Sequence, residues 1–247
     1  MGNAARKGCA SHALAICTPL GQARHMVPFS FAGHEFALTG GNALFWPAEN
    51  ALLVADLHLE KASWFAARGT MLPPYDSRET LERVALALRE TGARRVFCLG
   101  DNFHDAAGAD RLEPHAAGML AALTRATDWV WITGNHDAAL SVEGTVAEEL
   151  AISGIRLRHE ARKGETAPEL SGHFHPKLRV ALRGRTIARP CAVRSETRMI
   201  LPAFGTFTGG MDAADPAILA ALQPARAIDA VLPAGGKLIE WPLWRAA

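Results

Sequence analysis

The sequence predicts a layered α/β fold. Three short, uniformly apolar runs at residues 52–55, 96–99 and 129–132 are typical of strands that are buried on both faces. Stretches with apolar residues at helical spacing separate these runs, which is the alternation expected of an α/β protein. After the third run the pattern changes to shorter β-like segments, which Gly and Pro divide.

The first strand, residues 52–55, precedes a long amphipathic helix. We expect this helix to begin at Asp76, with Glu79 completing a capping box, and to end at Gly92. Its apolar stripe comprises Leu81, Val84, Ala85 and Leu88.

The second strand, residues 96–99, leads to a second helix, and the third strand follows at residues 129–132. One face of the second helix carries Leu112, Ala116, Met119, Leu120 and Leu123. The later β-like segments lie at residues 155–157, 178–182, 186–188 and 198–201, followed by a helix near 215–222 and strands near 227–232 and 237–241.

Length and composition fit one large domain. The chain has 247 residues, of which 49% are hydrophobic and 21% charged, as is ordinary for a soluble globular protein. We expect a mobile N-terminal extension at residues 1–28 and a single domain at residues 29–247. The apolar stretch at residues 13–17 is shorter than the core of a secretory signal, which is about 7–15 residues long.

Net charge and cysteine usage limit the classes of partner and compartment. The formal net charge of +1 indicates neither a nucleic-acid partner nor a membrane surface, so any DNA contact needs a local basic patch. No apolar run approaches the roughly 20 residues of a membrane helix, and we expect no membrane contact. The cysteines form no Cys-x-x-Cys pair and favour a reducing cytoplasm; they are Cys9, Cys17, Cys98 and Cys191.

Polar clusters follow all three predicted buried strands. In open α/β sheets, ligands bind at this carboxyl edge. The clusters are Asp56-Leu57-His58, Gly100-Asp101-Asn102 and Gly134-Asn135-His136-Asp137, with His159 and Gly172-His173-Phe174-His175 later in the chain.

These clusters offer carboxylate, amide and imidazole ligands but no thiolate, which suits Mn²⁺, Fe²⁺ or Zn²⁺. Residues two apart in an extended segment point to the same side, so Asp56 and His58 can converge on one ion, as can His173 and His175. Two ions about 3.5–4 Å apart need a shared ligand. Asp101, which follows the middle strand, is the natural candidate for this bridge.

Each cluster alone is a weak signal. An Asp-x-His is more often a surface pair, a Gly-Asp usually marks a turn, and a lone histidine is more often solvated than a ligand. The joint pattern favours a metal site, because five of the ten histidines fall inside ordered polar clusters.

The same motifs, in this order, are those of the calcineurin-like metallophosphoesterase superfamily, which the chain resembles over residues 50–176. This resemblance implies a four-layer αββα sandwich, in which helices flank two mixed β-sheets. Within the superfamily the chain is similar to the ligase-associated DNA damage response endonucleases, at residues 55–61, 68–69, 72–76, 99–101, 103–105, 201–205 and 208–210.

By position, the resemblance implies two divalent metal ions, with Mn²⁺ first and Fe²⁺ or Zn²⁺ as alternatives. One ion would be held by Asp56, His58 and His175, the second by Asn135, His159 and His173, and Asp101 would bridge them. His136 would face the scissile phosphate as general acid or charge stabiliser, with Asp137 as its neighbour.

Two positions depart from the superfamily pattern. His104 stands where many members carry a second acid; it can either approach the site or serve only the loop. Ala161 follows His159-Glu160, where close relatives often have Pro. His159 is nevertheless the only histidine between His136 and His173.

Three residues are candidates for substrate binding: Lys61, Asn102 and His104. Lys61 follows the first ligand pair closely enough to reach a phosphate, whereas the other basic residues nearby are more simply solvated surface charges. The resemblance implies a DNA substrate and a DNA-repair role beside a DNA ligase, an exonuclease and a helicase. Assembly into a homo-oligomer is a further possibility.

Three functions remain in play. The leading hypothesis is a DNA endonuclease or phosphodiesterase. The second is a small-molecule phosphatase or cyclic-nucleotide phosphodiesterase with the same ions, because the chain leaves little room for a separate DNA-binding domain. The third is a metal-binding scaffold without turnover in a repair complex, against which His136 argues, since a scaffold has no need of a histidine that is not a ligand.

Overall fold

Two seven-stranded mixed sheets pack face to face in the computed structural model, which describes residues 26–136, 142–182 and 184–246. Residues 1–25, most of the expected N-terminal extension, lie outside the described residues. The remaining part of that extension is placed differently from the prediction. Residues Met26 to Pro28 already pair with the neighbouring strand and belong to the first sheet.

The first sheet runs in the order β1-β2-β3-β4-β5-β6-β7 and changes from antiparallel to parallel pairing at β4. Its strands are β1 (Met26–Phe31), β2 (His34–Thr39), β3 (Leu44–Trp46), β4 (Ala51–Val54), β5 (Arg95–Leu99), β6 (Asp128–Ile132) and β7 (Thr145–Ala147). The three strands predicted to be buried are β4, β5 and β6, and they lie side by side.

The second sheet runs in the order β16-β15-β13-β14-β10-β9-β8, and its parallel pairs are β14 with β10 and β10 with β9. Its strands are β8 (Glu149–Ile152), β9 (Ile155–Arg158), β10 (Glu169–Ser171), β13 (Ala192–Arg194), β14 (Arg198–Ile200), β15 (Ala227–Ala234) and β16 (Lys237–Arg245). A separate hairpin consists of β11 (Lys177–Leu182) and β12 (Arg185–Pro190).

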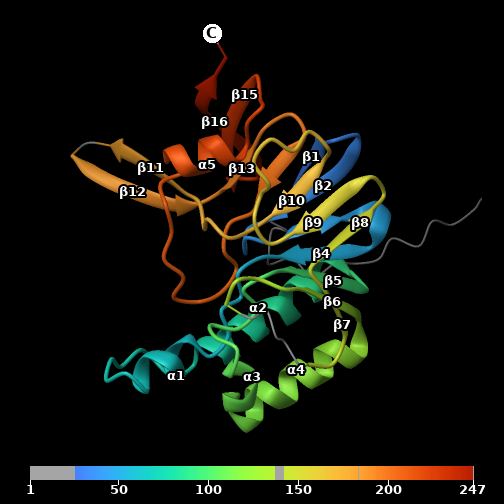
Figure 1. The fold of residues 1–247 in the computed structure, drawn as a ribbon, viewed down its shortest axis with the longest axis vertical. Helices are drawn as coiled ribbons and strands as arrows, with labels where there is room; N and C mark the ends of the chain where they lie inside the picture. Colours follow the sequence, from blue (N-terminus) through green and yellow to red (C-terminus); the bar gives the residue numbers. More distant parts are fainter. Residues whose placement is uncertain (1–25, 137–141, 183, 247) are drawn as a thin grey trace, which may run out of the picture.

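Helices cover the two outer faces. Figure 1 shows α2 and α4 below the first sheet and α5 beside β13 and β16 of the second, with the β11–β12 hairpin projecting to one side. The predicted four-layer αββα arrangement is therefore confirmed. The helices are α1 (Lys61–Ala66), α2 (Asp76–Thr91), α3 (Gly108–Arg111), α4 (Pro114–Ala126) and α5 (Pro216–Ala221), with a 3₁₀ turn η1 (Pro47–Glu49).

Alternating side chains of the first sheet build two cores. Leu53 and Leu99 face the second sheet, where they pack in one cluster with Leu157 and Met199. Leu52 and the other buried residues on the opposite face of the first sheet pack against α2 and α4. Strands buried on both sides explain why their sequences read as unbroken apolar runs.

The predicted capping box at the start of α2 is wrong. Asp76 is the first helical residue, and Tyr75 occupies the N-cap position without a side-chain cap. The Asp76 carboxylate instead accepts a hydrogen bond from the backbone N–H of Ala62, 2.9 Å away. The predicted end at Gly92 is confirmed, because Gly92 caps the helix in the left-handed conformation, with φ of 71°.

A buried ion pair joins β9 and β10 in the second sheet. The Nε atom of Arg158 lies 3.2 Å from the Oε2 atom of Glu169, and both side chains are almost fully buried. Arg198 of β14 is buried beside them and donates hydrogen bonds to two backbone carbonyls. Charges in such a position need partners, since desolvating an unpaired ion is costly.

Within the described segments, every helix is too short or too polar to cross a membrane.

Candidate metal centre

The polar clusters after β4, β5 and β6 meet at the carboxyl edge of the first sheet. The backbone continues the strand pairing past the strand ends, because Asp56 N–H donates to the Gly100 carbonyl at 3.1 Å and His58 N–H to the Asp101 carbonyl at 2.9 Å. The side chains of the two clusters are therefore held beside each other.

Asp56, His58 and His175 form the first group of potential ligands. One ligand atom from each lies within 4.8 Å of those of the other two. The Nε2 atom of His175 is 3.2 Å from Nε2 of His58 and 3.4 Å from Oδ1 of Asp56. These are the three residues predicted to hold one ion.

Asp101, His159 and His173 form the second group, again with ligand atoms within 4.8 Å of one another. The Nδ1 atom of His173 lies 3.0 Å from Nε2 of His159, and the Oδ1 atom of Asn135 lies 2.9 Å from the same nitrogen. The Nδ1 atom of His159 faces the Leu99 carbonyl at 3.1 Å. Donation of Nδ1–H to this carbonyl fixes the tautomer that leaves Nε2 available to a ligand.

Asp101 lies between the two groups. Its Oδ2 atom is 3.8 Å from Nε2 of His58 in the first group, and its Oδ1 atom is 3.4 Å from Nε2 of His159 in the second. A carboxylate with one oxygen directed to each group has the geometry that the predicted bridge requires.

The donor set fits divalent cations. Asp56 and Asp101 are buried, and no Lys or Arg of the described segments pairs with either carboxylate. Buried carboxylates of this kind are paired or coordinate metal ions. Burial lowers the pKa of His58 to about 2 and also lowers the pKa of His173. Both imidazoles are thus neutral at pH 7, the form in which histidine binds a metal.

Five of the seven predicted ligands have left-handed backbone conformations. Their φ angles are 53° for Asp56, 44° for His58, 47° for Asp101, 74° for His173 and 49° for His175. Residues other than glycine adopt this region at a cost of about 1–2 kcal/mol each. Such strain concentrates at functional sites, where the surrounding structure enforces the conformation.

Gly134 is required for space rather than for a special backbone angle. A Cβ atom at this position would overlap the backbone nitrogen and Oδ1 of Asp101. The segment after β6 therefore packs closely against the candidate bridging ligand.

His136 lies at the open side of the centre. Its side chain is 38% exposed, and its Nε2 atom is 3.9 Å from Oδ2 of Asp101. Its backbone N–H donates to Oδ1 of Asp101 at 3.1 Å, and its Nδ1 atom faces the backbone carbonyl of His104 at 2.8 Å. Asp137, the predicted neighbour in catalysis, lies outside the described residues.

The His104 side chain approaches the centre instead of serving only the loop. Its Nδ1 atom is 3.4 Å from Nδ1 of His58, and its ring stacks on His136 with centroids 5.3 Å apart. The rings of Trp64 and Phe65 flank it at 4.9 and 5.8 Å. The two aromatic residues were not predicted, although both lie in α1, directly after the first ligand pair.

Lys61 and Asn102 are placed very differently. Lys61 is half-buried at the start of α1, where burial and Lys177 lower its pKa and Asp76 opposes that shift. Asn102 is fully buried, and its Nδ2 atom donates to the Ile132 carbonyl at 2.8 Å. It links the segment after β5 to β6, and its predicted role in substrate binding stays a prediction.

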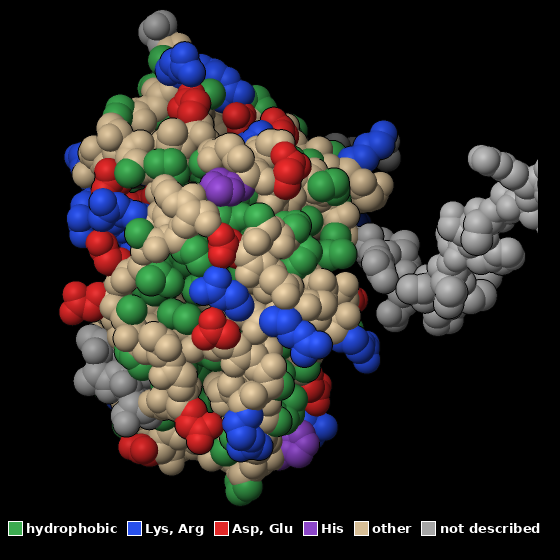
Figure 2. Space-filling view, turned by 90° about the vertical axis from the view of Figure 1, so that its right-hand side faces the viewer, with side chains coloured by type: hydrophobic (Ala, Val, Ile, Leu, Met, Phe, Trp, Pro, Cys, Tyr) green, Lys and Arg blue, Asp and Glu red, His purple; other side chains and the backbone are tan. Residues whose placement is uncertain are grey.

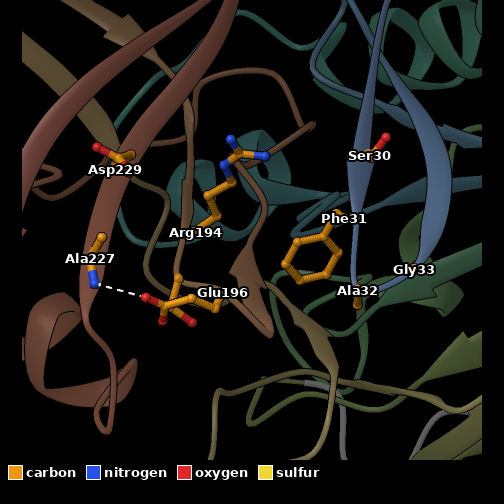
Figure 3. Close-up of a pocket in the computed structure, with 9 residues that line it drawn as sticks. Ser30, Phe31, Ala32, Gly33, Arg194, Glu196, Ala227 and Asp229 are labelled. Carbon is orange, nitrogen blue, oxygen red and sulfur yellow. Dashed lines mark hydrogen bonds between the residues drawn. The ribbon is translucent and has the colours of Figure 1, made fainter.

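A pocket of about 400 Å³ lies away from the ligand groups. It is bounded by the β1–β2 turn on one side and by β13 and β15 on the other (Figure 3). Its charged groups already have partners. Arg194 pairs with Glu240 at 2.7 Å, Asp229 with Arg245 at 2.6 Å, and Glu196 accepts the backbone N–H of Ala227 at 3.0 Å. These three charged side chains of the pocket therefore serve contacts within the fold.

Comparison with known proteins is consistent with this geometry. The family model for calcineurin-like phosphoesterases matches residues 50–177. Among solved structures, the Pseudomonas putida nuclease MPE is 30% identical; the alignment covers 88% of this chain and all of that one, with a TM-score of 0.65. No curated protein matches the sequence.

Two more distant structures also match. They are Yfce, a phosphoesterase from E. coli (15% identity, 76% of this chain and 96% of that one, TM-score 0.38), and a predicted phosphoesterase from Streptococcus pneumoniae (14%, 78% and 96%, TM-score 0.32). The family match includes every candidate ligand from Asp56 to His175. This chain belongs to the calcineurin-like phosphoesterase family and is a metal-dependent phosphoesterase.

Proposed function

We propose that the chain hydrolyses phosphodiester bonds in DNA, as a nuclease or phosphodiesterase with a role in DNA repair. The observation that carries this proposal is the pair of ligand groups that meet at Asp101, with the partly exposed His136 beside them. The nuclease from Pseudomonas putida, whose whole length aligns with this chain, supports a nucleic-acid substrate.

The two groups would hold two divalent ions. Asp56, His58 and His175 would bind one, Asn135, His159 and His173 the other, and Asp101 both. When bound, such a pair of ions supplies Lewis-acid catalysis of phosphoester hydrolysis, and we propose Mn²⁺.

His136 would act on the leaving oxygen. Donation of its Nδ1–H to the His104 carbonyl orients the ring and leaves Nε2 available, 3.9 Å from Oδ2 of Asp101. From there a protonated imidazole can stabilise or protonate the leaving group, which contributes about 10²–10⁴-fold to the rate when the group is well placed.

Lys61 would contact the phosphate rather than a base. It lies close enough to His58 and His104 to influence the electrostatics of both. A lysine ammonium is a compact charge suited to phosphate oxygens. It offers no base-specific geometry, so it supports binding to any nucleotide sequence.

The overall surface charge does not point to a broad DNA-binding face. Figure 2 shows one side of the molecule, on which Lys and Arg alternate with Asp and Glu without a continuous basic area. With a net charge of +1, contacts to DNA would have to concentrate near the centre.

A small-molecule phosphatase or cyclic-nucleotide phosphodiesterase is the second candidate, because the same ligand groups could serve it and the face in Figure 2 has no continuous basic area. Assays with Mn²⁺ on circular DNA, bis-p-nitrophenyl phosphate and p-nitrophenyl phosphate separate the possibilities. We expect cleavage of DNA and of the diester, with DNA cleavage declining steeply with added salt. Monoester hydrolysis alone would favour the small-molecule phosphatase, and metal binding without any turnover would favour the scaffold.

The cellular setting is also a proposal. The resemblance to ligase-associated endonucleases supports functional association with a DNA ligase, an exonuclease and a helicase. The spacing of the cysteines supports the cytoplasm. The predicted single domain over residues 29–247 stays a proposal, and it would also include Met26–Pro28, because β1 and β16 lie in two sheets that share a core.

A further inference from the structure

A pocket of about 260 Å³ opens directly beside the candidate metal centre. Its lining includes His175, which also belongs to the first ligand group. The other lining residues used below are Lys177 at the start of β11, Arg83 of α2 and Phe207. A group bound in this pocket would therefore adjoin a phosphate at the centre.

Two cations line the pocket, and Glu79 lies near enough to Arg83 to favour its charged form. Within the described segments, neither Lys177 nor Arg83 forms an ion pair with a carboxylate. Lys177 donates to the Thr208 carbonyl at 3.2 Å, and Arg83 donates to the Gly41 carbonyl at 2.9 Å. Both retain further N–H groups, so the pocket suits an anion.

An exposed aromatic pair forms the rim. Phe207 is 38% exposed and Tyr75 is 52% exposed, and their ring centroids lie 6.1 Å apart. Aromatic rings exposed beside cationic groups are the combination that binds unpaired nucleotides, because the face of a base stacks on the ring.

The Phe207 loop is fixed to the centre. Gly205 N–H donates to the backbone carbonyl of Asp56 at 3.2 Å, and Thr206 N–H donates to Oγ1 of Thr80 at 3.1 Å. Phe207 itself has a left-handed backbone, with φ of 58°. A ring held in position before binding loses little conformational freedom when a ligand arrives.

We propose that this pocket is a subsite for an unpaired nucleotide that adjoins the scissile phosphodiester. The proposal rests on the proposed DNA phosphodiesterase function and names the part of the substrate that is recognised. Complete small-molecule sites measure about 300–1,000 Å³, so this smaller pocket takes the phosphate and sugar, with the phosphate between Lys177 and Arg83. The base stacks on Phe207 at the rim, with Tyr75 extending the aromatic surface. A base inside a duplex has no free face for this contact.

Binding measurements test the subsite independently of turnover. Fluorescence anisotropy would measure the affinity of Mn²⁺-loaded protein for two labelled DNAs. One is a single-stranded oligothymidine with phosphorothioate linkages, which resist hydrolysis, and the other is the duplex that contains the same strand. Phe207→Ala should weaken binding of the single strand about tenfold and of the duplex less than about twofold. Phe207→Trp should restore binding to near the wild-type value. Lys177→Gln should weaken both substrates and reduce the salt slope by about one.

Trp241→Ala is the matched control, because Trp241 is 45% exposed on β16, at an edge of the second sheet. If Phe207→Ala and Trp241→Ala bound the single strand with equal affinity, the subsite would be overturned. The same would follow if Phe207→Ala lost equal affinity for the single strand and for the duplex. Phe207→Leu, which keeps apolar bulk without the ring face, decides the question if the alanine variant fails to fold. Hydrolysis of bis-p-nitrophenyl phosphate by the wild-type protein is measured in parallel. Its absence would overturn the proposed function, while the anisotropy result still decides the subsite.

Discussion

The imidazole of His58 has a nitrogen neighbour on each side. Its Nδ1 atom lies 3.4 Å from Nδ1 of His104, whereas its Nε2 atom lies 3.2 Å from Nε2 of His175 in the first ligand group. Burial lowers the pKa of His104 to about 4, so at pH 7 this ring is neutral and can accept the Nδ1–H of His58. By accepting this hydrogen bond, His104 can orient His58 from the side of the ring opposite His175.

Replacement of His104 should weaken metal binding. Loss of an outer partner of a metal-ligating histidine typically costs 10–100-fold in affinity, and we expect His104→Ala to weaken Mn²⁺ binding by about this factor in calorimetric titration. The contact between His136 and the His104 backbone carbonyl is retained in this variant. His115→Ala, on the exposed face of α4, is the control; equal affinities for both variants would exclude the orienting role.

Replacement of His136 should separate metal binding from turnover. We expect His136→Ala to retain full metal content, because all seven candidate ligands remain, and to lose about 10²–10⁴-fold in kcat. Metal content is measured by mass spectrometry and turnover with bis-p-nitrophenyl phosphate. A variant with full metal content and a near-normal rate would remove His136 from the mechanism.

A methyl group at Gly134 should disrupt the centre. The new Cβ would collide with Asp101, and overpacking of this kind costs about 1–3 kcal/mol, so Gly134→Ala should lower the free energy of unfolding and metal affinity together. Gly118 lies in α4 with open space around its Cβ position. Gly118→Ala should raise the free energy of unfolding by about 0.5–1 kcal/mol through helix propensity. Urea denaturation measures both, and equal signs would contradict this account.

The buried Glu169 should give a pH-dependent contribution to stability. Burial raises its pKa above the ordinary value, and the Arg158 guanidinium opposes this rise. A carboxyl that binds its proton more tightly in the folded protein stabilises the fold at low pH, and this contribution is lost as the pH rises through the higher folded pKa. The free energy of unfolding of the wild type, minus that of Glu169→Gln, should therefore fall as the pH increases above about 4. Urea denaturation across a pH series checks this; a difference that grows with pH would reverse the assignment.

The central strands could be predicted because both of their faces are buried. Residues 52–55, 96–99 and 129–132 match β4, β5 and β6 to within one residue at each end. Short strands such as β10 and β13 have no comparable apolar run, whereas the apolar run at residues 43–46, which contains β3, was not assigned to a strand. The capping box failed because the Asp76 carboxylate has a partner in α1, a contact that local spacing does not reveal.

The candidate ligands could be grouped from sequence because parallel strands end at a common edge of the sheet. Side-chain direction beyond that edge could not be predicted. Asn102 follows Asp101 directly, yet it points into the sheet and binds the Ile132 carbonyl. Arg83 and Phe207 join the pocket beside His175 only through the fold, since no local pattern connects them with the metal motifs.

The candidate ligands are divided between the two sheets, and each group draws on both. Asp56 and Asp101 follow strands of the first sheet, whereas His159, His173 and His175 follow strands of the second. Each bound ion would thus act as a cross-link between the two halves of the chain. A protein cut between β7 and β8, where the chain passes from one sheet to the other, would remain associated in Mn²⁺ and separate more readily in a chelator.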